Sequence, residues 1–188
     1  MGVFSLLFGR KNAPYDPERA IARAILSYRP GAHQLDVLRI AYLAQIEHAG
    51  RLGSRIVPTP FIASSMGPMN QGILKKAKTL RMMAKRNPGL LSQEHSLPAE
   101  AEATVRSVCQ KTAGMTSAQL VSLIHNREGC WAKFYHPDPY STLSISDPRR
   151  ATMKPRDVYD GHVIPFDAMI DQYHRSRIAA NASSNPKG

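Results

Sequence analysis

"HQLDVLRIAYLAQIEHAGRL", residues 33–52, is the stretch of sequence that decides the fold. Its apolar residues recur every three or four positions, the spacing of one helix face: Leu35, Leu38, Tyr42, Ile46 and Ala49. Further apolar residues widen this face around the helix: Val37, Ile40, Ala41 and Ala44. A helix with so much apolar surface must be covered on several sides, so the stretch predicts a central, buried helix, with Gly50 as its cap.

The flanking sequence predicts more helices and one extended insertion. Residues 15–31 have Asp16 placed to cap a helix and Pro17 at its first position. Residues 54–65 combine two prolines with β-branched and aromatic residues, which favours a short hairpin or edge strands. Four further helices are predicted: from about Pro68 to Arg86, over 96–114 with Ser96 as cap, over 116–129 with a Thr116–Gln119 capping box, and over about 165–178.

These elements predict a mainly α fold, a compact single domain of five to six helices with a small extended hairpin-like insertion. We expect residues 1–14 to form a flexible N-terminal arm and residues 15–178 to form the domain. Within it, the proline-rich stretch of about 135–162 is expected to be an irregular loop. Residues 179–188 are expected to form a disordered tail.

Composition points to a soluble protein of the cytoplasm. Hydrophobic residues make up 43% of the chain and charged residues 21%, values typical of globular proteins. No apolar run approaches the roughly 20 residues that a membrane helix needs. Two cysteines are too few for a disulfide framework, which agrees with a reducing compartment.

Positive charge is concentrated in the first half of the chain. The net charge is +11, and residues 1–95 hold fourteen Lys and Arg against five Asp and Glu. The segment "KKAKTLRMMAKR", 75–86, predicts a basic helix stripe with Leu74, Leu80, Met82 and Met83 on its apolar side. Its cations are candidate contacts for an acidic protein or for nucleic acid, or form a solvated face: Lys75, Lys76, Lys78, Arg81, Lys85 and Arg86.

A second notable stretch, "LVSLIHNREGCWAKFY" at 120–135, brings His125, Glu128, Cys130 and Trp131 together. A catalytic thiol would need a base within hydrogen-bond reach, but His125 and Cys130 do not share a helix face. The favoured interpretation is structural, with Trp131 and Phe134 in the core and Cys130 filling space. The histidine spacings match no helical zinc site and the glycines match no phosphate loop, so we expect no catalytic residues, metal or cofactor.

The order of these segments resembles the Panacea domain, the SocA-like antitoxin family that is also met in phage-associated proteins. Three motifs carry the resemblance, in the right order and over roughly residues 17–175: Leu35, Leu38, Tyr42 and Ala44; then Ala63, Gly67, Pro68 and Met69; then Leu120, Leu123, His125 and Trp131. The chain departs from the family pattern at Met66, Ile124 and Cys130, where the family has tyrosine, threonine and proline. It therefore looks like a divergent member.

The resemblance implies a non-catalytic protein-binding module of a toxin–antitoxin system. Such a module neutralises a cognate toxin by direct complex formation or as an adaptor for proteolysis. The motif residues then serve the fold or the partner surface: Leu38, Tyr42, Gly67, Pro68, His125 and Trp131. Two alternatives remain open, namely a phage or mobile-element inhibitor of a host factor and a nucleic-acid-binding regulator that uses the 75–86 helix.

Overall fold

The computed structural model describes residues 14–92, 97–136, 146, 148 and 161–183 of the chain. Their helices are α1 (Pro17–Tyr28), α2 (Gln34–Leu52), α3 (Gln71–Arg86), α4 (Ala99–Lys111), α5 (Ser117–Ile124), α6 (Cys130–Phe134) and α9 (Phe166–Ser183), with a 3₁₀ turn η1 (Pro88–Ser92). Two short strands, β1 (Ile62–Ser64) and β2 (Gly67–Met69), form the hairpin. The predicted mainly α fold with a small hairpin is confirmed. Across these residues, no helix has the length and apolar character needed to cross a membrane.

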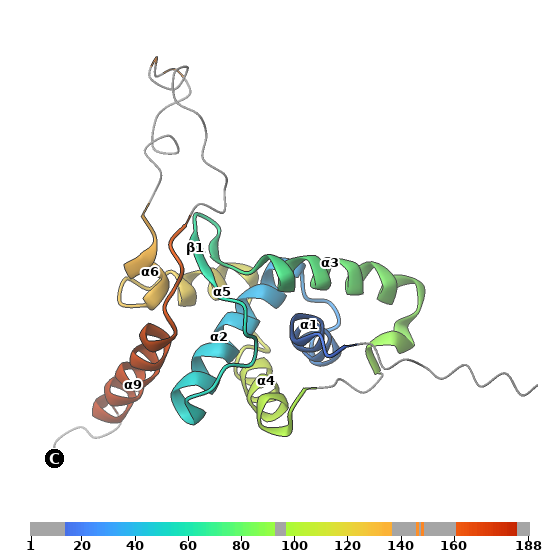
Figure 1. Ribbon diagram of the computed structural model, residues 1–188, viewed down its shortest axis with the longest axis horizontal. Coiled ribbons are helices and arrows are strands. Elements are labelled where there is room, and N and C mark those ends of the chain that lie inside the picture. Colours follow the sequence, from blue (N-terminus) through green and yellow to red (C-terminus); the bar gives the residue numbers. More distant parts are fainter. Residues whose placement is uncertain (1–13, 93–96, 137–145, 147, 149–160, 184–188) are drawn as a thin grey trace, which may run out of the picture.

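Helix α2 lies at the centre of the fold, as its sequence pattern predicts. It packs against α1, α3, α4, α5 and α9 and against β2 (Figure 1). Val37, Ile40, Ala41 and Ala44 are fully buried, and Tyr42 is 1% exposed. Burying a large apolar side chain stabilises a fold by about 1.5–3 kcal/mol, so the largely buried α2 contributes much of the core.

The contact between α2 and α9 depends on Gly50, which lies inside α2 and does not cap it. A Cβ atom at Gly50 would lie 2.2 Å from the Cγ atom of Tyr173 on α9. The cap is Gly53, whose left-handed backbone (φ 62°) ends the helix while its N–H donates to the Ala49 carbonyl. The expectation for Gly50 was therefore wrong, because a close helix–helix approach requires this glycine.

The hairpin extends further along the chain than predicted. Pro68 lies in β2, where it pairs with Ala63, and does not start a helix. Helix α3 begins instead at Gln71, capped by Asn70, whose side-chain oxygen accepts from the Ile73 N–H at 3.0 Å. On its other edge, β1 meets the chain just before α9 through a bridge between Ile62 and Val163.

Other predicted elements are confirmed or shifted at their ends. Asp16 caps α1, and Thr116 forms the capping box with Gln119. Helix α4 begins after its N-cap residue, Pro98, and the expected cap, Ser96, lies outside the described residues. The short helix α6 was not predicted, and α9 continues to Ser183, past the expected end at 178. The N-terminal arm except Pro14, most of the expected loop at 135–162, and residues 184–188 lie outside the described residues.

Replacing Gly50 by alanine tests the close packing of α2 on α9. Helix propensity alone would favour Gly50→Ala by about 1 kcal/mol. We expect the opposite sign, a loss of about 2 kcal/mol in the free energy of unfolding, because the new methyl group overpacks against Tyr173. Urea unfolding followed by circular dichroism measures the change. Gly114→Ala is the matched control, since nothing lies within 4 Å of its Cβ position; equal effects of the two changes would contradict this packing.

Candidate functional site

A stack of three aromatic rings lies at the centre of the second notable stretch, residues 120–135. The Trp131 ring lies between His125, with ring centroids 4.0 Å apart, and Tyr135, at 4.8 Å. The Trp131 indole N–H donates to the Ser64 carbonyl of β1 at 3.0 Å. A Cβ atom on Gly67 would meet His125 Nε2 at 3.4 Å. The stack therefore joins α5 and α6 to the hairpin.

Cys130 is held in the interior by two polar contacts. Its thiol lies 2.8 Å from the Tyr42 hydroxyl on α2. Its backbone N–H donates to Gln172 Oε1 of α9 at 2.7 Å. A proline, which the family pattern has at this position, could not donate that hydrogen bond. The departure at Cys130 thus ties α6 to both α2 and α9.

The surroundings of Cys130 oppose thiol chemistry. The residue is fully buried, and burial raises the pKa of its thiol above the ordinary value. Burial likewise raises the pKa of Tyr42, so the contact between the two is one of neutral groups. His125 stacks flat on Trp131 and caps the C-terminus of α5. The residues lie near each other in sequence, but the geometry does not make them a nucleophile and its base.

His125 is half-buried and titrates below its ordinary range. Burial is the main reason for the lowered pKa, and the positive charge of Arg39 adds to it. His48, on α2, has a lowered pKa for the same main reason. It is held between the hydroxyls of Thr104, at 3.2 Å, and Ser54, at 3.1 Å. Both imidazoles are therefore neutral at physiological pH.

Most of the motif residues are core residues. Leu38, Tyr42 and Trp131 are 2%, 1% and 8% exposed, and Gly67 and Pro68 are buried as well. Of the six residues assigned to the fold or the partner surface, only His125 reaches the surface in part. Their positions support a role in the fold and leave little of them for a partner to touch.

Sequence reasoning missed two residues of this cluster. Tyr135 follows Trp131 by four positions, the spacing of neighbours on a helix face, so this signal was present. Gln172 gave no signal, because its contact with Cys130 depends on how α9 docks. In the described part of the chain, no group of three or more His, Cys, Asp or Glu side chains is placed to hold a metal ion.

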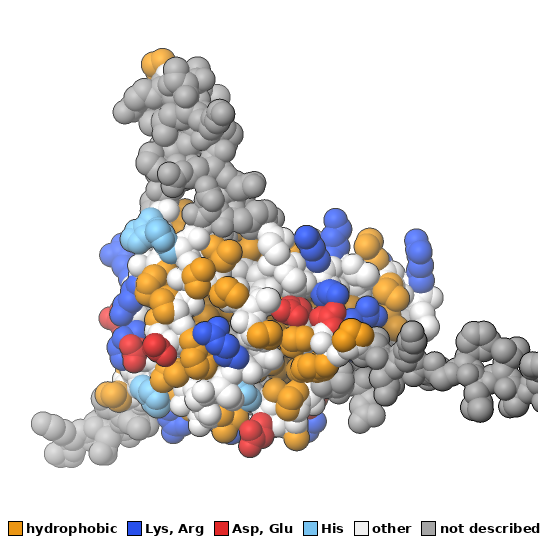
Figure 2. All heavy atoms as spheres, in the orientation of Figure 1, with side chains coloured by type: hydrophobic (Ala, Val, Ile, Leu, Met, Phe, Trp, Pro, Cys, Tyr) orange, Lys and Arg blue, Asp and Glu red, His pale blue; other side chains and the backbone are white. Residues whose placement is uncertain are grey.

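The exposed face of α3 is the second candidate site. Lys and Arg side chains gather over this helix, with hydrophobic atoms between them (Figure 2). The helix buries Ile73, Ala77 and Leu80 and contains no Asp or Glu. We call its exposed cations, together with the exposed Met82, the basic face: Lys75, Lys78, Met82, Lys85 and Arg86. Among the described residues, none of these four cations takes part in an ion pair.

The structure separates the six candidate cations into two groups. Lys76 leaves the basic face, because its ammonium pairs with Asp16 at 2.5 Å. Arg81 is half-buried, and its guanidinium donates to Gln34 Oε1 at a long 3.5 Å. The expected apolar side is wrong in part, since Met82 and Met83 are 53% and 40% exposed. Leu123, a residue of the third motif, is 46% exposed as well.

Thiol alkylation tests whether Cys130 is reactive. Burial raises the pKa of Cys109 to about 12, and it raises that of Cys130 too. We expect both thiols of the folded protein to react with iodoacetamide at pH 8 at least a hundredfold more slowly than in guanidinium chloride, because the thiolate is the nucleophile. Mass spectrometry over time gives both rates. Fast alkylation of Cys130 alone, with Cys109 as the internal control, would contradict the structural role.

The two neutral histidines predict a pH dependence of stability. Their pKa values are lowered in the folded state, while an unfolded histidine titrates near about 6.5. The free energy of unfolding should be constant above this value and fall as the pH drops from about 6.5 towards 5, because protonation favours the unfolded chain. Urea unfolding at several pH values measures this fall. A His48→Gln/His125→Gln variant should show a smaller fall, and an unchanged slope would contradict the assignment.

Comparison with known proteins gives one match. Residues 38–132, slightly more than half of the chain, match the family described as Antitoxin SocA-like, Panacea domain. The matched segment runs from α2 to α6 and includes the aromatic stack up to Trp131. No curated protein and no solved structure matches the chain. The chain belongs to the SocA-like antitoxin family, of which it carries the Panacea domain.

Proposed function

We propose that this protein is a non-catalytic antitoxin-like module that neutralises a protein partner by binding it directly. The family supports an antitoxin-like role and suggests a non-enzymatic one. The observation that carries the proposal is the basic face of α3, where four cations surround the exposed Met82. The partner is a cognate toxin; a host factor, if the protein is an inhibitor borne by a phage or mobile element, would bind in the same way.

The chemistry of the basic face suggests what the partner presents to it. Cations without acidic neighbours on the helix attract an acidic surface and speed its approach. Met82 offers a flexible apolar contact among them, of the kind that adapts to a partner's surface. An acidic patch with an apolar centre would match both features.

Occlusion is the mechanism we propose: the basic face covers the functional surface of the partner while the complex lasts. An adaptor that delivers the partner to a protease would use the same first contact. The two differ in the cell, because only the adaptor lowers the amount of the partner. We propose a cytoplasmic location, in keeping with two cysteines that are buried and free.

Nucleic acid is the alternative partner for the same cations. The phosphates of a nucleic acid would bind these lysine and arginine side chains as well as carboxylates do, and the affinity would depend strongly on salt concentration. The α3 helix, however, contains no aromatic residue on which a base could stack. We therefore favour a protein.

Charge reversal tests the basic face. The tagged protein and its Lys75→Glu/Lys78→Glu variant are used to capture partners from host lysate, with and without nuclease. We expect one stoichiometric, nuclease-resistant protein, bound by the variant with an association rate lower by about tenfold because steering is lost. Surface plasmon resonance at two salt concentrations measures that rate.

Arg127→Glu/Lys133→Glu is the matched control, since it changes the same charge on exposed residues away from α3. It should leave the rate nearly unchanged. Equal losses of association rate in both variants would contradict a specific role of the basic face, because they would show that only the net charge of the protein matters. Capture that disappears after nuclease treatment would refute the protein partner and make nucleic acid the ligand.

A further inference from the structure

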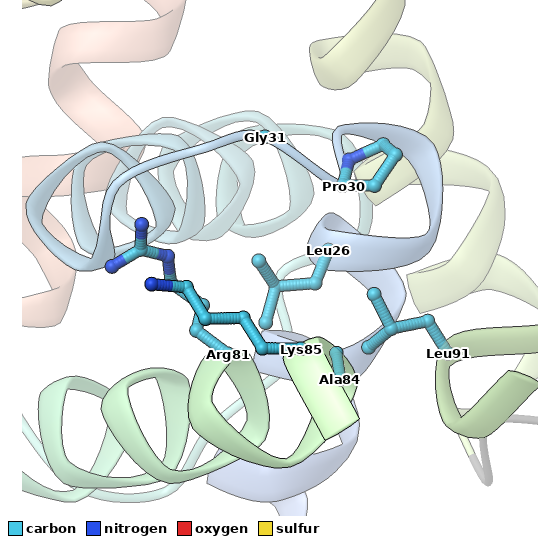
Figure 3. Close-up of a pocket in the computed structure, with 7 residues that line it drawn as sticks. All are labelled: Leu26, Pro30, Gly31, Arg81, Ala84, Lys85 and Leu91. Atoms are coloured by element: carbon cyan, nitrogen blue, oxygen red, sulfur yellow. The ribbon is translucent and has the colours of Figure 1, made fainter. Parts of the chain in front are cut away.

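A pocket lies beside the basic face, between the C-terminal ends of α1 and α3. Leu26 and Pro30 line it from α1 and the turn that follows. Arg81 and Lys85 line it from α3, and Leu91 from η1 (Figure 3). Its volume is about 290 Å³. Small-molecule sites usually measure about 300–1,000 Å³, so this pocket suits one side chain and a neighbouring group better than a cofactor.

The pocket is apolar inside and positive at its edge. Leu26 is fully buried and Leu91 is 8% exposed, so both belong to the floor. Arg81 and Lys85, one helical turn apart, point the same way beside this floor (Figure 3). The long 3.5 Å bond to Gln34 is the only hydrogen bond of the Arg81 guanidinium within the described residues, and it leaves most of its five donors for a ligand. A ligand with an aliphatic group next to a carboxylate would fit both the apolar floor and the positively charged edge.

We propose that this pocket binds an acidic peptide segment of a protein partner. An aliphatic side chain of the segment, such as leucine, enters between Leu26 and Leu91. A carboxylate next to it in the segment binds Arg81, in the bidentate geometry that guanidinium favours, and Lys85. This inference rests on the proposed function, because it names the part of the partner that α3 recognises.

Two observations favour a peptide over nucleic acid at this place. The described residues that line the pocket include no aromatic ring, so a base would gain no stacking on them. Met82 is 53% exposed and lies three residues before Lys85, so it neighbours that lysine on the helix surface and offers a further apolar contact outside the pocket. A peptide can use both the pocket and this surface, whereas a phosphate backbone uses only the cations.

Part of the pocket lies outside the segment that matches the family. Leu26 and Pro30 precede residue 38, at which the match begins, whereas Arg81, Lys85 and Leu91 fall within it. Helix α1 and the turn after it thus line one side of the pocket, and α3 and η1, which lie within the matched segment, line the other. Selection among acidic partners would then depend on α1 as well as on α3.

Short labelled peptides test the pocket without the natural partner. The probe is a fluorescein-labelled Asp-Glu-Leu-Asp-Glu peptide, compared with versions that carry serine in place of leucine or lysine in place of every acid. We expect fluorescence polarisation at about 50 mM salt to detect binding below about 1 mM. The serine peptide should bind at least about tenfold more weakly, because a leucine side chain loses its burial, and the basic peptide should not bind.

Matched variants locate the binding. Arg81→Ala/Lys85→Ala should weaken the leucine peptide about tenfold or more, while Lys75→Ala/Lys78→Ala, with the same loss of charge on the same helix, should weaken it less than about threefold. Ala84→Phe, which fills the pocket without changing charge, should also abolish binding. Circular dichroism and urea unfolding confirm that each variant is folded.

Several outcomes would overturn the proposal that this pocket binds an acidic peptide. Two concern specificity: equal effects of the two alanine pairs, and no preference for the leucine peptide over the serine peptide. Two concern affinity: no binding at about 1 mM peptide, and displacement of the labelled peptide by a twelve-nucleotide oligothymidylate at a lower concentration than the unlabelled leucine peptide needs. If the peptide fails while the captured protein still depends on Lys75 and Lys78, the inference fails and the proposed function stands. If the peptide binds as expected but no protein is captured, the pocket stands and the proposed function fails.

Discussion

The fold depends on covering one helix, α2, around its whole circumference. No single neighbour can bury a helix whose apolar residues point in every direction. The chain meets this demand with helices from both of its ends, α1 and α9, and with α3, α4 and α5 between them. At Gly50 the demand is sharpest, since only a residue without a side chain lets Tyr173 come so close. Segments from one end of the described chain to the other are thereby held in one core.

The aromatic stack takes its position from the same helix. Tyr42 of α2 contacts the Cys130 thiol, and Gln172 of α9 accepts from the Cys130 N–H, so α6 is fixed between the two helices that form the centre. Trp131 then reaches the hairpin through Ser64. A histidine, a thiol and a tryptophan that suggested chemistry in the sequence are explained by packing, because the Cys130 thiol, the Cys130 N–H and the indole N–H each already have a partner.

Local signals in the sequence predicted the elements that are local in origin. The period of α2, the Asp16 cap and the capping box at Thr116 each lie within a few residues, and each is confirmed. The basic stripe on α3 was read from the same kind of spacing, yet Met82 was placed on the wrong side; two residues after the buried Leu80, it lies nearly opposite on the helix.

The hairpin shows the limit of such reasoning. Gly67-Pro68 has the chemistry of a helix start, but it pairs with β1, and β1 is bridged in turn to a distant part of the chain from Ile62 to Val163. The orientation of His125 beside Trp131 and the contact of Gln172 arise in the same way. The pocket beside α3 could not be predicted either, because it exists only where the ends of α1, α3 and η1 meet.

The concentration of positive charge on α3 is not explained by the needs of the fold. Like charges close together on a helix repel one another and lower its stability, and α3 has no acidic residue to offset them. Its last-turn cations, Lys85 and Arg86, gain a little from the helix dipole, but Lys75 and Lys78 lie too far from that end. The chain does neutralise other cations, as Asp16 does for Lys76 on the same helix and Glu47 for Lys111 on α4. Among the described residues no acidic side chain pairs with the basic face, which lies beside an apolar pocket, and this agrees with our proposal that its acidic partner comes from another molecule.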